Sequence, residues 1–314
     1  MRVLITDNCH EVLSSRLRQA GYEVVTGATL DYDALLSLVP DFDALVVRSK
    51  VRIDRRFLDG CGSRLRCIGR LGAGMETIDV EYAEHKGICC LNSPEGNRDA
   101  VGEHALALLL ALFDRITLAD AEVRQGLWRR EENRGLEVKG KTVGIIGFGN
   151  MGAAFAQRLR GFECRILAYD KYRHGHAPDY VEEVSLEQLQ RESDVVSLHV
   201  PLTDETRDMV DESFLAAFAK PVYLINTARG AVVKTSAVAA ALRSGRVLGA
   251  GMDVMEYEDM SKDGLDLDSI PDDLRYLLSS PRTVLTPHVG GWTVESKYKL
   301  AAVMADKIIT LLNK

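Results

Sequence analysis

Short apolar runs alternate with segments of helical periodicity along most of the chain. Runs of four to six apolar residues indicate buried parallel strands, whereas apolar residues that recur every three or four positions indicate the buried face of a helix. In the first hundred residues, strands are expected at Val3–Thr6, Glu23–Val25, Ala44–Val47, Leu65–Arg70 and Ile88–Leu91. Helices are expected between the first of these strands, so the order predicts a small parallel α/β domain.

The alternation resumes after a turn-rich segment at Asn92–Asn97 and a long apolar helix expected from about Arg98 to Ala119. Further strands are expected at Thr142–Ile146, Cys164–Tyr169, Asp194–His199, Val222–Asn226, Val247–Asp253 and Thr283–Leu285. An amphipathic helix is expected over Val294–Leu312. The second part of the chain, roughly residues 98–285, is therefore predicted to form a six-stranded doubly wound sheet.

The segment from Lys141 to Asp170 joins two of these strands through GFGNMG, which has the spacing G-x-G-x-x-G. In such a turn Gly147 permits the tight bend, Gly149 lets the backbone approach a pyrophosphate, and Gly152 lets the helix pack on the strand. Asp170 ends the second strand, near the spacing of about 20 residues at which a carboxylate binds the adenosine ribose. We predict a dinucleotide site here; the alternative is a tight turn that binds nothing.

The charge, the apolar stretches and the cysteines of the chain limit the kinds of partner and compartment that can be expected. The chain has 314 residues, with 39 Lys and Arg against 46 Asp and Glu, and a formal net charge of −7. Nothing in this balance suggests a nucleic-acid or membrane partner, and a local basic patch is the alternative. The longest apolar stretch, Val101–Phe113, is too short to cross a bilayer, and the N-terminus lacks the apolar run of a signal peptide. The six cysteines form no C-x-x-C pair, so a reduced, cytoplasmic protein without a metal site is expected.

Three polar side chains follow predicted strands of the second part: Arg229, Glu258 and His288. The carboxyl ends of parallel strands meet at one edge, where open α/β sheets bind ligands. A histidine can exchange a hydroxyl proton in both directions, a carboxylate can orient it, and a guanidinium can hold a substrate carboxylate. Alone, such a histidine is more often structural. Together, the three predict hydride transfer between a dinucleotide and a 2-hydroxy or 2-keto acid.

Several longer motifs extend this interpretation. They are LGAGMETID from Leu71, GNRDAVGEHALALLL from Gly96, GFGNMG from Gly147, NTARG from Asn226, and GMDV followed by TPHVGG between Gly251 and Gly291. In these motifs the chain resembles the D-isomer-specific 2-hydroxyacid dehydrogenases over nearly its whole length. The resemblance implies a Rossmann doubly wound parallel sheet, residues 98–285. That sheet would be inserted in a smaller flavodoxin-like parallel α/β substrate domain, residues 1–97 plus 286–314.

The resemblance also implies catalytic roles. The family's arginine falls on Arg229 and its histidine on His288. Its glutamate falls on Glu258, with Glu256 as the alternative. The chain departs from the family pattern at Asp259, where a proline is usual, and in an acidic insertion at 259–272 that lengthens the segment before the histidine.

NAD is the implied cofactor, because Asp170 would repel the 2′-phosphate of NADP. Lys171 and Arg173, which follow it, make NADP the alternative. Asp253 would contact the nicotinamide carboxamide. The residues expected around the cofactor are Gly147, Phe148, Gly149, Asn150, Met151, Gly152, Asp170, His199, Val200, Pro201, Thr206, Thr227, Ala228, Asp253 and Gly290.

The implied substrate is a small 2-hydroxy or 2-keto acid, bound by the backbone at Ala73 and Gly74 and by Asn97. Arg48 and Ser49, in the segment RSK after the third predicted strand, resemble the residues that phosphoglycerate dehydrogenases use for their substrate's phosphate. The sequence therefore favours 3-phosphoglycerate. Glyoxylate, hydroxypyruvate and D-lactate are the alternatives within the family.

Two further expectations concern partners. A non-catalytic, NAD-sensing or scaffold protein on the same fold is the alternative from another functional class. The resemblance suggests a homodimer joined through the cofactor domains, with Glu122–Gly140 reaching across. Trp128 in that segment and Trp292 after the double glycine either line a functional surface or pack locally.

Overall fold

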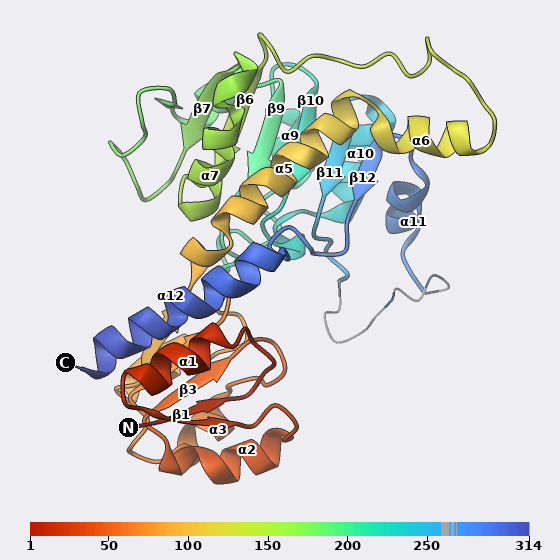
Figure 1. Cartoon of the computed structure of the whole chain (residues 1–314). Coiled ribbons are helices and arrows are strands. Elements are labelled where there is room, and N and C mark those ends of the chain that lie inside the picture. The colour runs from red at the N-terminus through yellow and green to blue at the C-terminus, as the bar shows by residue number, and fades with distance from the viewer. Residues whose placement is uncertain (259–263, 265–266, 268, 314) are drawn as a thin grey trace. The chain divides into compact units, whose positions relative to one another are not determined.

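The computed structural model describes residues 1–258, 264, 267 and 269–313. The chain divides into two compact units, one formed by Met1–Asp99 and Trp292–Lys314 and the other by Ala100–Gly291. Each unit is a parallel sheet covered by helices on both faces (Figure 1), which is the α/β fold that the sequence predicted. Asp259 and most of the acidic insertion lie outside the described residues.

The first unit has a five-stranded sheet in the order β2-β1-β3-β4-β5. Its strands are β1 (Arg2–Ile5), β2 (Glu23–Thr26), β3 (Ala44–Val47), β4 (Cys67–Arg70) and β5 (Cys89–Asn92). Every neighbouring pair is parallel. This is the flavodoxin-like order, in which the chain reverses its direction of progress between β1 and β3.

Two separate clusters of buried side chains form on the two faces of this sheet. The helices α1 and α12 cover one face, and α2, α3 and α4 cover the other. Their bounds are α1 (Val12–Gln19), α2 (Tyr32–Leu38), α3 (Arg55–Gly60), α4 (Val80–His85) and α12 (Val294–Leu312). Because α12 packs on the same face as α1, the last helix of the chain belongs to the first unit.

The second unit has a seven-stranded parallel sheet in the order β12-β11-β10-β9-β6-β7-β8. Its strands are β6 (Thr142–Ile146), β7 (Arg165–Tyr169), β8 (Glu182–Glu183), β9 (Val195–Leu198), β10 (Val222–Asn226), β11 (Val247–Met252) and β12 (Thr283–Leu285). The strand order reverses between β6 and β9. Dinucleotides bind at such a switch point, outside the carboxyl ends of the strands.

Helices sandwich this second sheet, so its central strands are buried on both sides. Figure 1 shows α5 and α7 in front of the sheet, and they share one buried cluster. The helices behind it contribute to the other cluster. The bounds are α5 (Arg98–Phe113), α7 (Asn150–Leu159), α8 (Leu186–Glu192), α9 (Glu212–Ala216), α10 (Thr235–Ser244) and α11 (Asp272–Ser279). Double-sided burial explains why the strands read as nearly continuous apolar runs.

Three details of the predicted organisation were wrong. The sheet has seven strands, because the exposed two-residue edge strand β8 carries no apolar pattern. The long helix expected from residue 98 to 119 ends at Phe113, and α6 (Ile116–Arg124) begins after Arg115. Arg115 has φ of 53°, a left-handed conformation that ends a helix. Residues 286–291 lie in the second unit rather than the first, since N–H groups of this segment donate hydrogen bonds to Met252 and Asp253 at the end of β11.

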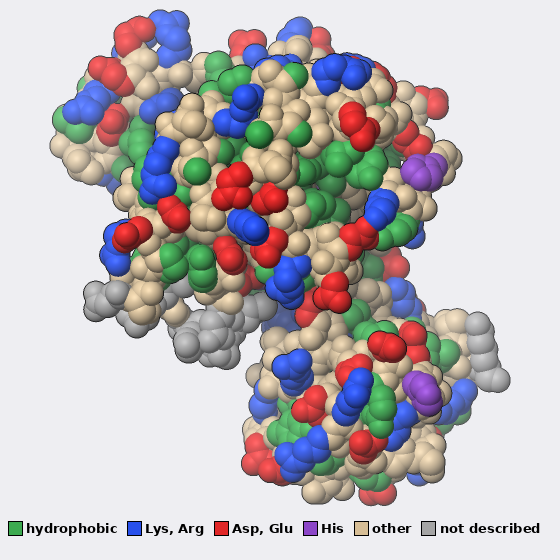
Figure 2. Space-filling view, turned by 180° about the vertical axis from the view of Figure 1, so that it is seen from behind, with side chains coloured by type: hydrophobic (Ala, Val, Ile, Leu, Met, Phe, Trp, Pro, Cys, Tyr) green, Lys and Arg blue, Asp and Glu red, His purple; other side chains and the backbone are tan. Residues whose placement is uncertain are grey.

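The surface shows no gathering of charge by sign on the face seen in Figure 2, where acidic and basic side chains are interspersed over each unit. In the described part of the chain, no helix combines the length and the apolar character needed to span a bilayer. No group of three or more potential metal ligands was found among the described residues.

Candidate active site

The glycine-rich turn between β6 and α7 has the geometry that its sequence predicted. Gly147 has φ of +88°, and a Cβ there would lie 2.7 Å from the carbonyl oxygen of His199. A Cβ on Gly152 would lie 2.2 Å from the carbonyl oxygen of Gly147, so only glycine lets the helix approach this closely. At Gly149, by contrast, an added Cβ meets nothing within 4 Å. The space beside Gly149 is therefore open for a phosphate group at the start of α7.

Asp170, which follows β7, is hydrogen-bonded to this turn. Its Oδ2 accepts a hydrogen bond from the backbone N–H of Phe148 over 2.8 Å. Its Oδ1 accepts from the N–H groups of Tyr172 and Arg173 over 3.0 Å. Lys171 forms an ion pair with Glu205. A carboxylate has about four acceptor sites, and three are used, so Asp170 keeps capacity for one ribose hydroxyl. Lys171, which would bind a 2′-phosphate, already has a carboxylate partner.

Other residues expected around the cofactor line the carboxyl ends of β9 and β10. His199 Nδ1 and Thr227 Oγ1 are buried without a hydrogen-bond partner among the described residues. The other ring nitrogen of His199 lies 2.9 Å from Ser197 Oγ. Burial lowers the pKa of His199 to about 3, so the ring is neutral. Buried polar atoms left unpaired in this way call for a partner.

The loop after β9 is held by Thr206, whose hydroxyl donates to the carbonyl oxygen of Pro201 over 2.6 Å. Val200 packs against the glycine-rich turn, with its Cγ1 only 3.0 Å from the place of a Cβ on Gly147. The sequence had placed all three residues beside the cofactor, and the fold puts them at the same strand end as the glycine-rich turn.

Arg229 stands in a short turn after β10 that Asn226 organises. The buried Asn226 side chain accepts from the N–H of Ala228 over 3.0 Å and donates to the carbonyl oxygen of Arg229 over 3.2 Å. A Cβ on Gly230 would lie 1.9 Å from the carbonyl oxygen of Met255, so this turn presses against the segment after β11. The motif NTARG thus brings the arginine beside the segment that carries both candidate glutamates.

His288 and Glu258 are brought together although they follow different strands. Nδ1 of His288 lies 3.2 Å from Oε2 of Glu258, and both side chains are about one quarter exposed. Glu256, the alternative partner, instead accepts from the N–H of Thr235 at the start of α10 over 2.8 Å. The geometry therefore pairs the imidazole with Glu258.

Asp253, at the end of β11, is buried and holds the turn that carries the histidine. Its carboxylate accepts from the N–H groups of Val289 and Gly290 over 2.8 Å each, and from the hydroxyl of Thr286 over 2.6 Å. Burial raises the pKa of Asp253, but the hydrogen bonds from His104, Thr286 and these amides outweigh burial and hold it below its usual value. The carboxylate is thus charged and nearly saturated by donors of its own chain.

In the first unit, the RSK segment after β3 is organised by a residue that the sequence analysis missed. The carboxylate of Asp7, which follows β1, accepts from the backbone N–H groups of Arg48, Ser49 and Lys50 over 3.0 to 3.4 Å. The signal was available, because Asp7 stands at the carboxyl end of a predicted strand, as Arg48 does.

Side chains of the same segment also have partners. Lys50 Nζ donates to the carbonyl oxygen of Leu30 over 2.7 Å. The Arg48 guanidinium stacks over the Trp292 ring, 4.2 Å from its centroid. Trp292, whose role the sequence left open, is therefore a support for the arginine while its own side chain stays largely exposed.

The other expected substrate residues lie after β4 and β5. The N–H groups of Ala73 and Gly74 make no hydrogen bond with any described residue, whereas Gly72 N–H donates to Ser93 Oγ over 3.3 Å. Asn97 Oδ1 is buried without a partner in the described part of the chain. The two free N–H groups suit the anionic group of a ligand, and the unpaired amide oxygen can accept a hydrogen bond from a hydroxyl group.

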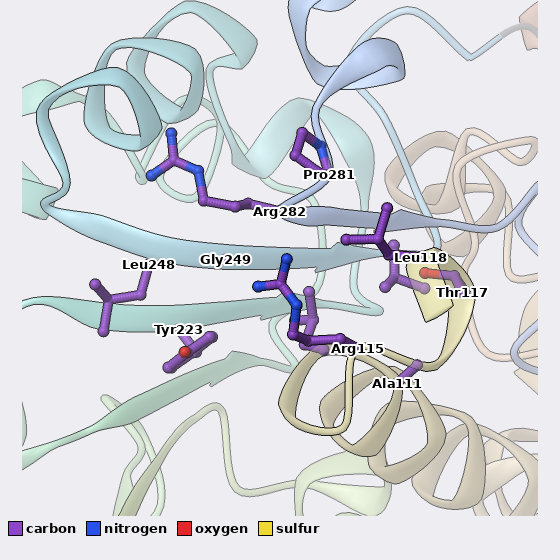
Figure 3. Close-up of a pocket in the computed structure, with 11 residues that line it drawn as sticks. Ala111, Arg115, Thr117, Leu118, Tyr223, Leu248, Gly249, Pro281 and Arg282 are labelled. Carbon is purple, nitrogen blue, oxygen red and sulfur yellow. The ribbon is translucent and has the colours of Figure 1, made fainter. Parts of the chain in front are cut away.

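The pocket in Figure 3 is not part of this site. Arg115, Tyr223, Leu248 and Arg282 line it, at the amino ends of β10, β11 and β12. The candidate catalytic residues follow the carboxyl ends of the same strands. A parallel sheet places these two ends at opposite edges.

Comparisons with known proteins identify the family of the chain. A model of the D-isomer specific 2-hydroxyacid dehydrogenase NAD binding domain matches residues 106–290. Hydroxypyruvate reductase of Thermotoga maritima is 36% identical over 308 residues, 98% of this chain and 97% of the relative. D-3-phosphoglycerate dehydrogenase of Archaeoglobus fulgidus is 33% identical over 313 residues, 99% of this chain but 57% of the relative.

Solved structures share the whole fold. D-lactate dehydrogenase of Aquifex aeolicus, solved with NAD and lactic acid, matches 100% of this chain and 94% of its own, with a TM-score of 0.80 and 26% sequence identity. The chain therefore belongs to the D-isomer specific 2-hydroxyacid dehydrogenase family. It is an NAD-dependent oxidoreductase that acts on 2-hydroxy acids, and the predicted family, fold, enzyme class and cofactor are confirmed.

Proposed function

We propose that the enzyme reduces a short, unphosphorylated 2-keto acid to the D-2-hydroxy acid, and catalyses the reverse oxidation, with His288 as the acid and base. The contact between His288 and Glu258 carries this proposal. The bound dinucleotide would supply the hydride that reduces C2 of the keto acid, and the protonated imidazole of His288 gives its proton to the carbonyl oxygen. Glu258 accepts the Nδ1–H of the ring and so leaves Nε2 to face the substrate.

Arg229 binds the substrate carboxylate in this proposal, since a guanidinium matches a carboxylate with two parallel hydrogen bonds. The free N–H groups of Ala73 and Gly74, with Asn97, bind the same acid. Phe148, Asn150 and Met151 of the glycine-rich turn, with Asp170, bind the adenosine and pyrophosphate parts of NAD. Asp253 Oδ2 keeps room for one donor besides Gly290 N–H, which leaves a place for the carboxamide.

The surroundings of Asp7 favour an unphosphorylated substrate, although the sequence favoured 3-phosphoglycerate. The carboxylate of Asp7 occupies the N–H groups of the RSK segment, and a second anion there would be repelled. Lys50 is engaged with carbonyl oxygens. Hydroxypyruvate and glyoxylate are the favoured substrates, and the relative that this chain matches over nearly its full length is named hydroxypyruvate reductase.

3-Phosphoglycerate is the second candidate. It rests on the Arg48 guanidinium, held over Trp292, and on the exposed Arg52 nearby in the sequence. It also rests on the phosphoglycerate dehydrogenase relative, of which this chain spans 57%.

The decisive measurement is NADH oxidation with hydroxypyruvate, glyoxylate, pyruvate, 2-ketoglutarate and 3-phosphohydroxypyruvate, repeated with Arg48→Ala. The proposal expects the highest kcat/KM with an unphosphorylated acid. A strong preference for the phosphorylated acid, lost in Arg48→Ala, would instead establish the second candidate. Absence of turnover with every acid, while NADH still binds, would favour the NAD-sensing alternative.

We also propose that the protein forms a homodimer through α6 and the segment that follows it. The helix α6 has no buried residue, and Ile116 and Val123 are 52% and 51% exposed. Trp128 is 78% exposed. The pocket of Figure 3, with the exposed Leu248, lies beside the start of this helix. Sedimentation velocity tests the proposal: wild type should sediment as a dimer and Val123→Glu as a monomer, and a monomeric wild type would refute it.

A further inference from the structure

His104 is a polar residue on the apolar helix α5, and none of the roles described above uses it. Its Nε2 lies 2.9 Å from Oγ1 of Thr286 and 3.3 Å from Oδ1 of Asp253. Its side chain is only 20% exposed. Its ring also borders Gly290, where an added Cβ would come within 3.3 Å of the ring. His104 therefore contacts both ends of the turn that carries the catalytic histidine.

The hydrogen bonds among these residues run in one direction. The Thr286 hydroxyl donates to Asp253 over 2.6 Å, because an ionised carboxylate can only accept. The Thr286 oxygen can then accept, so His104 donates to it through Nε2–H. This order requires a hydrogen on Nε2 of His104. The result is a chain from His104 through Thr286 to the buried carboxylate, and Nε2 of His104 also lies 3.3 Å from Oδ1 of that carboxylate.

The backbone is strained at His288, within the turn that the Asp253 carboxylate holds. His288 has φ of 55°, a left-handed conformation that is unfavourable for a residue with a side chain. Its N–H donates to the backbone oxygen of Asp253 over 2.7 Å, and the next two N–H groups donate to the Asp253 carboxylate. Strain of this kind persists only where surrounding contacts hold it. Asp253 thus anchors three successive N–H groups at the point where the catalytic imidazole leaves the backbone.

We propose that His104 is a positioning residue for the reaction. Through Thr286 and Asp253, it fixes the turn at 288–290 so that the His288 imidazole faces Glu258 and the substrate. His104 itself touches no reacting atom. Where it concerns turnover, this inference rests on the proposed function. Loss of the His104 donor leaves the Asp253 anchor less well placed. It should reduce kcat more than the affinity for NADH, since only the carboxamide contact of Asp253 is disturbed and the glycine-rich turn is unaffected.

Paired variants separate the hydrogen bond from packing. His104→Phe keeps a ring without a donor, whereas His104→Gln keeps an N–H donor at a similar reach. Losing one charge-linked hydrogen bond should lower kcat about tenfold in His104→Phe, with little change in the Kd of NADH from fluorescence titration. His104→Gln should recover most of the loss. The exposed His85 of α4 supplies the matched control, and His85→Phe should retain wild-type kcat.

Thr286 gives an independent pair, which also covers the case in which His104→Phe does not fold. Thr286→Val should lower kcat as His104→Phe does, and Thr286→Ser should not. The double variant His104→Phe/Thr286→Val should lose little more than either single variant, because both changes break one chain. Additive losses in kcat, or a loss that neither Gln nor Ser recovers, would overturn the inference.

Hydrogen exchange gives a readout that does not depend on turnover. The N–H groups of Val289 and Gly290 are bonded to Asp253 in the wild type. Mass spectrometry of the peptide covering 286–291 should show faster exchange in His104→Phe than in His104→Gln or wild type. If wild type turned over no 2-keto acid, the proposed function would fail while this test still stood. Identical exchange in all three proteins would overturn the positioning role.

Discussion

Glu258 and His288 face one another across the ends of two neighbouring strands, with Oε2 3.2 Å from Nδ1. Glu256, two residues earlier, turns the other way and accepts the N–H of Thr235 at the start of α10. The two glutamates are alike in sequence context, yet one is placed to orient the histidine and the other to begin a helix. The same substitution at Glu258 and at Glu256 therefore tests which glutamate takes part in catalysis.

Glu258→Gln should lower kcat with the best keto acid by about 10- to 100-fold, because a neutral amide orients the imidazole and stabilises its protonated form less well. Glu256→Gln should leave kcat near wild type and lower the free energy of unfolding by about 1 kcal/mol, through a weaker bond at the helix start. Steady-state kinetics and urea unfolding of both variants check this. The reverse pattern would transfer the catalytic role to Glu256.

Two glycines of the dinucleotide turn should respond oppositely to alanine. Gly152→Ala places a Cβ 2.2 Å from a backbone oxygen, so it should destabilise the fold by about 1–3 kcal/mol. Gly149→Ala meets nothing in the chain and should leave stability unchanged, but its methyl group enters the space proposed for the pyrophosphate. Thermal unfolding and NADH titration separate the two effects. An unchanged Kd for NADH in Gly149→Ala would argue against a cofactor there.

Removing the charge of Asp170 should relax the choice of cofactor. Asp170→Asn keeps an oxygen for the Phe148 N–H and loses the charge, so kcat/KM with NADH should fall roughly tenfold. The value with NADPH should rise, and rise further when Glu205→Gln releases Lys171 from its ion pair. Kinetics with both cofactors give the ratio directly. If the ratio of kcat/KM with NADH to that with NADPH does not change, Asp170 stabilises the turn and does not bind the ribose.

His199 predicts a particular loss of stability in acid. Burial lowers its pKa from 6.5 to about 3. Between these values the unfolded chain binds a proton that the folded chain does not, so the free energy of unfolding falls as pH drops below about 6.5. The slope from this residue is at most about 1.4 kcal/mol per pH unit. Urea unfolding between pH 7.5 and 5 should show a shallower slope for His199→Gln than for wild type or His85→Gln.

The local features of the fold could be predicted from the sequence. Apolar runs located most of the strands, because burial on both faces leaves a pattern within each run. The spacing of Gly147, Gly149 and Gly152 indicated the dinucleotide turn, because the tight bend, the open space beside the helix start and the close approach of helix to strand all require glycine. Arg229, Glu258 and His288 stood out because each follows a strand, and parallel strands collect such residues at one edge.

Other relationships could be decided only by the tertiary structure. The bond between His104 and Thr286 joins residues 182 positions apart, and the Asp7 carboxylate reaches the N–H of Arg48 41 positions away. The local pattern around His104 indicates no such partner, and the pattern around Asp7 indicates only that it lies at the same edge of the sheet as Arg48. They depend on which strands become neighbours and on the exact direction of each side chain. The sequence by itself thus determined the fold class and the chemistry of hydride transfer. The tertiary structure decided which groups support the histidine and which N–H groups a carboxylate of the chain already occupies, because those contacts form only when distant strand ends meet.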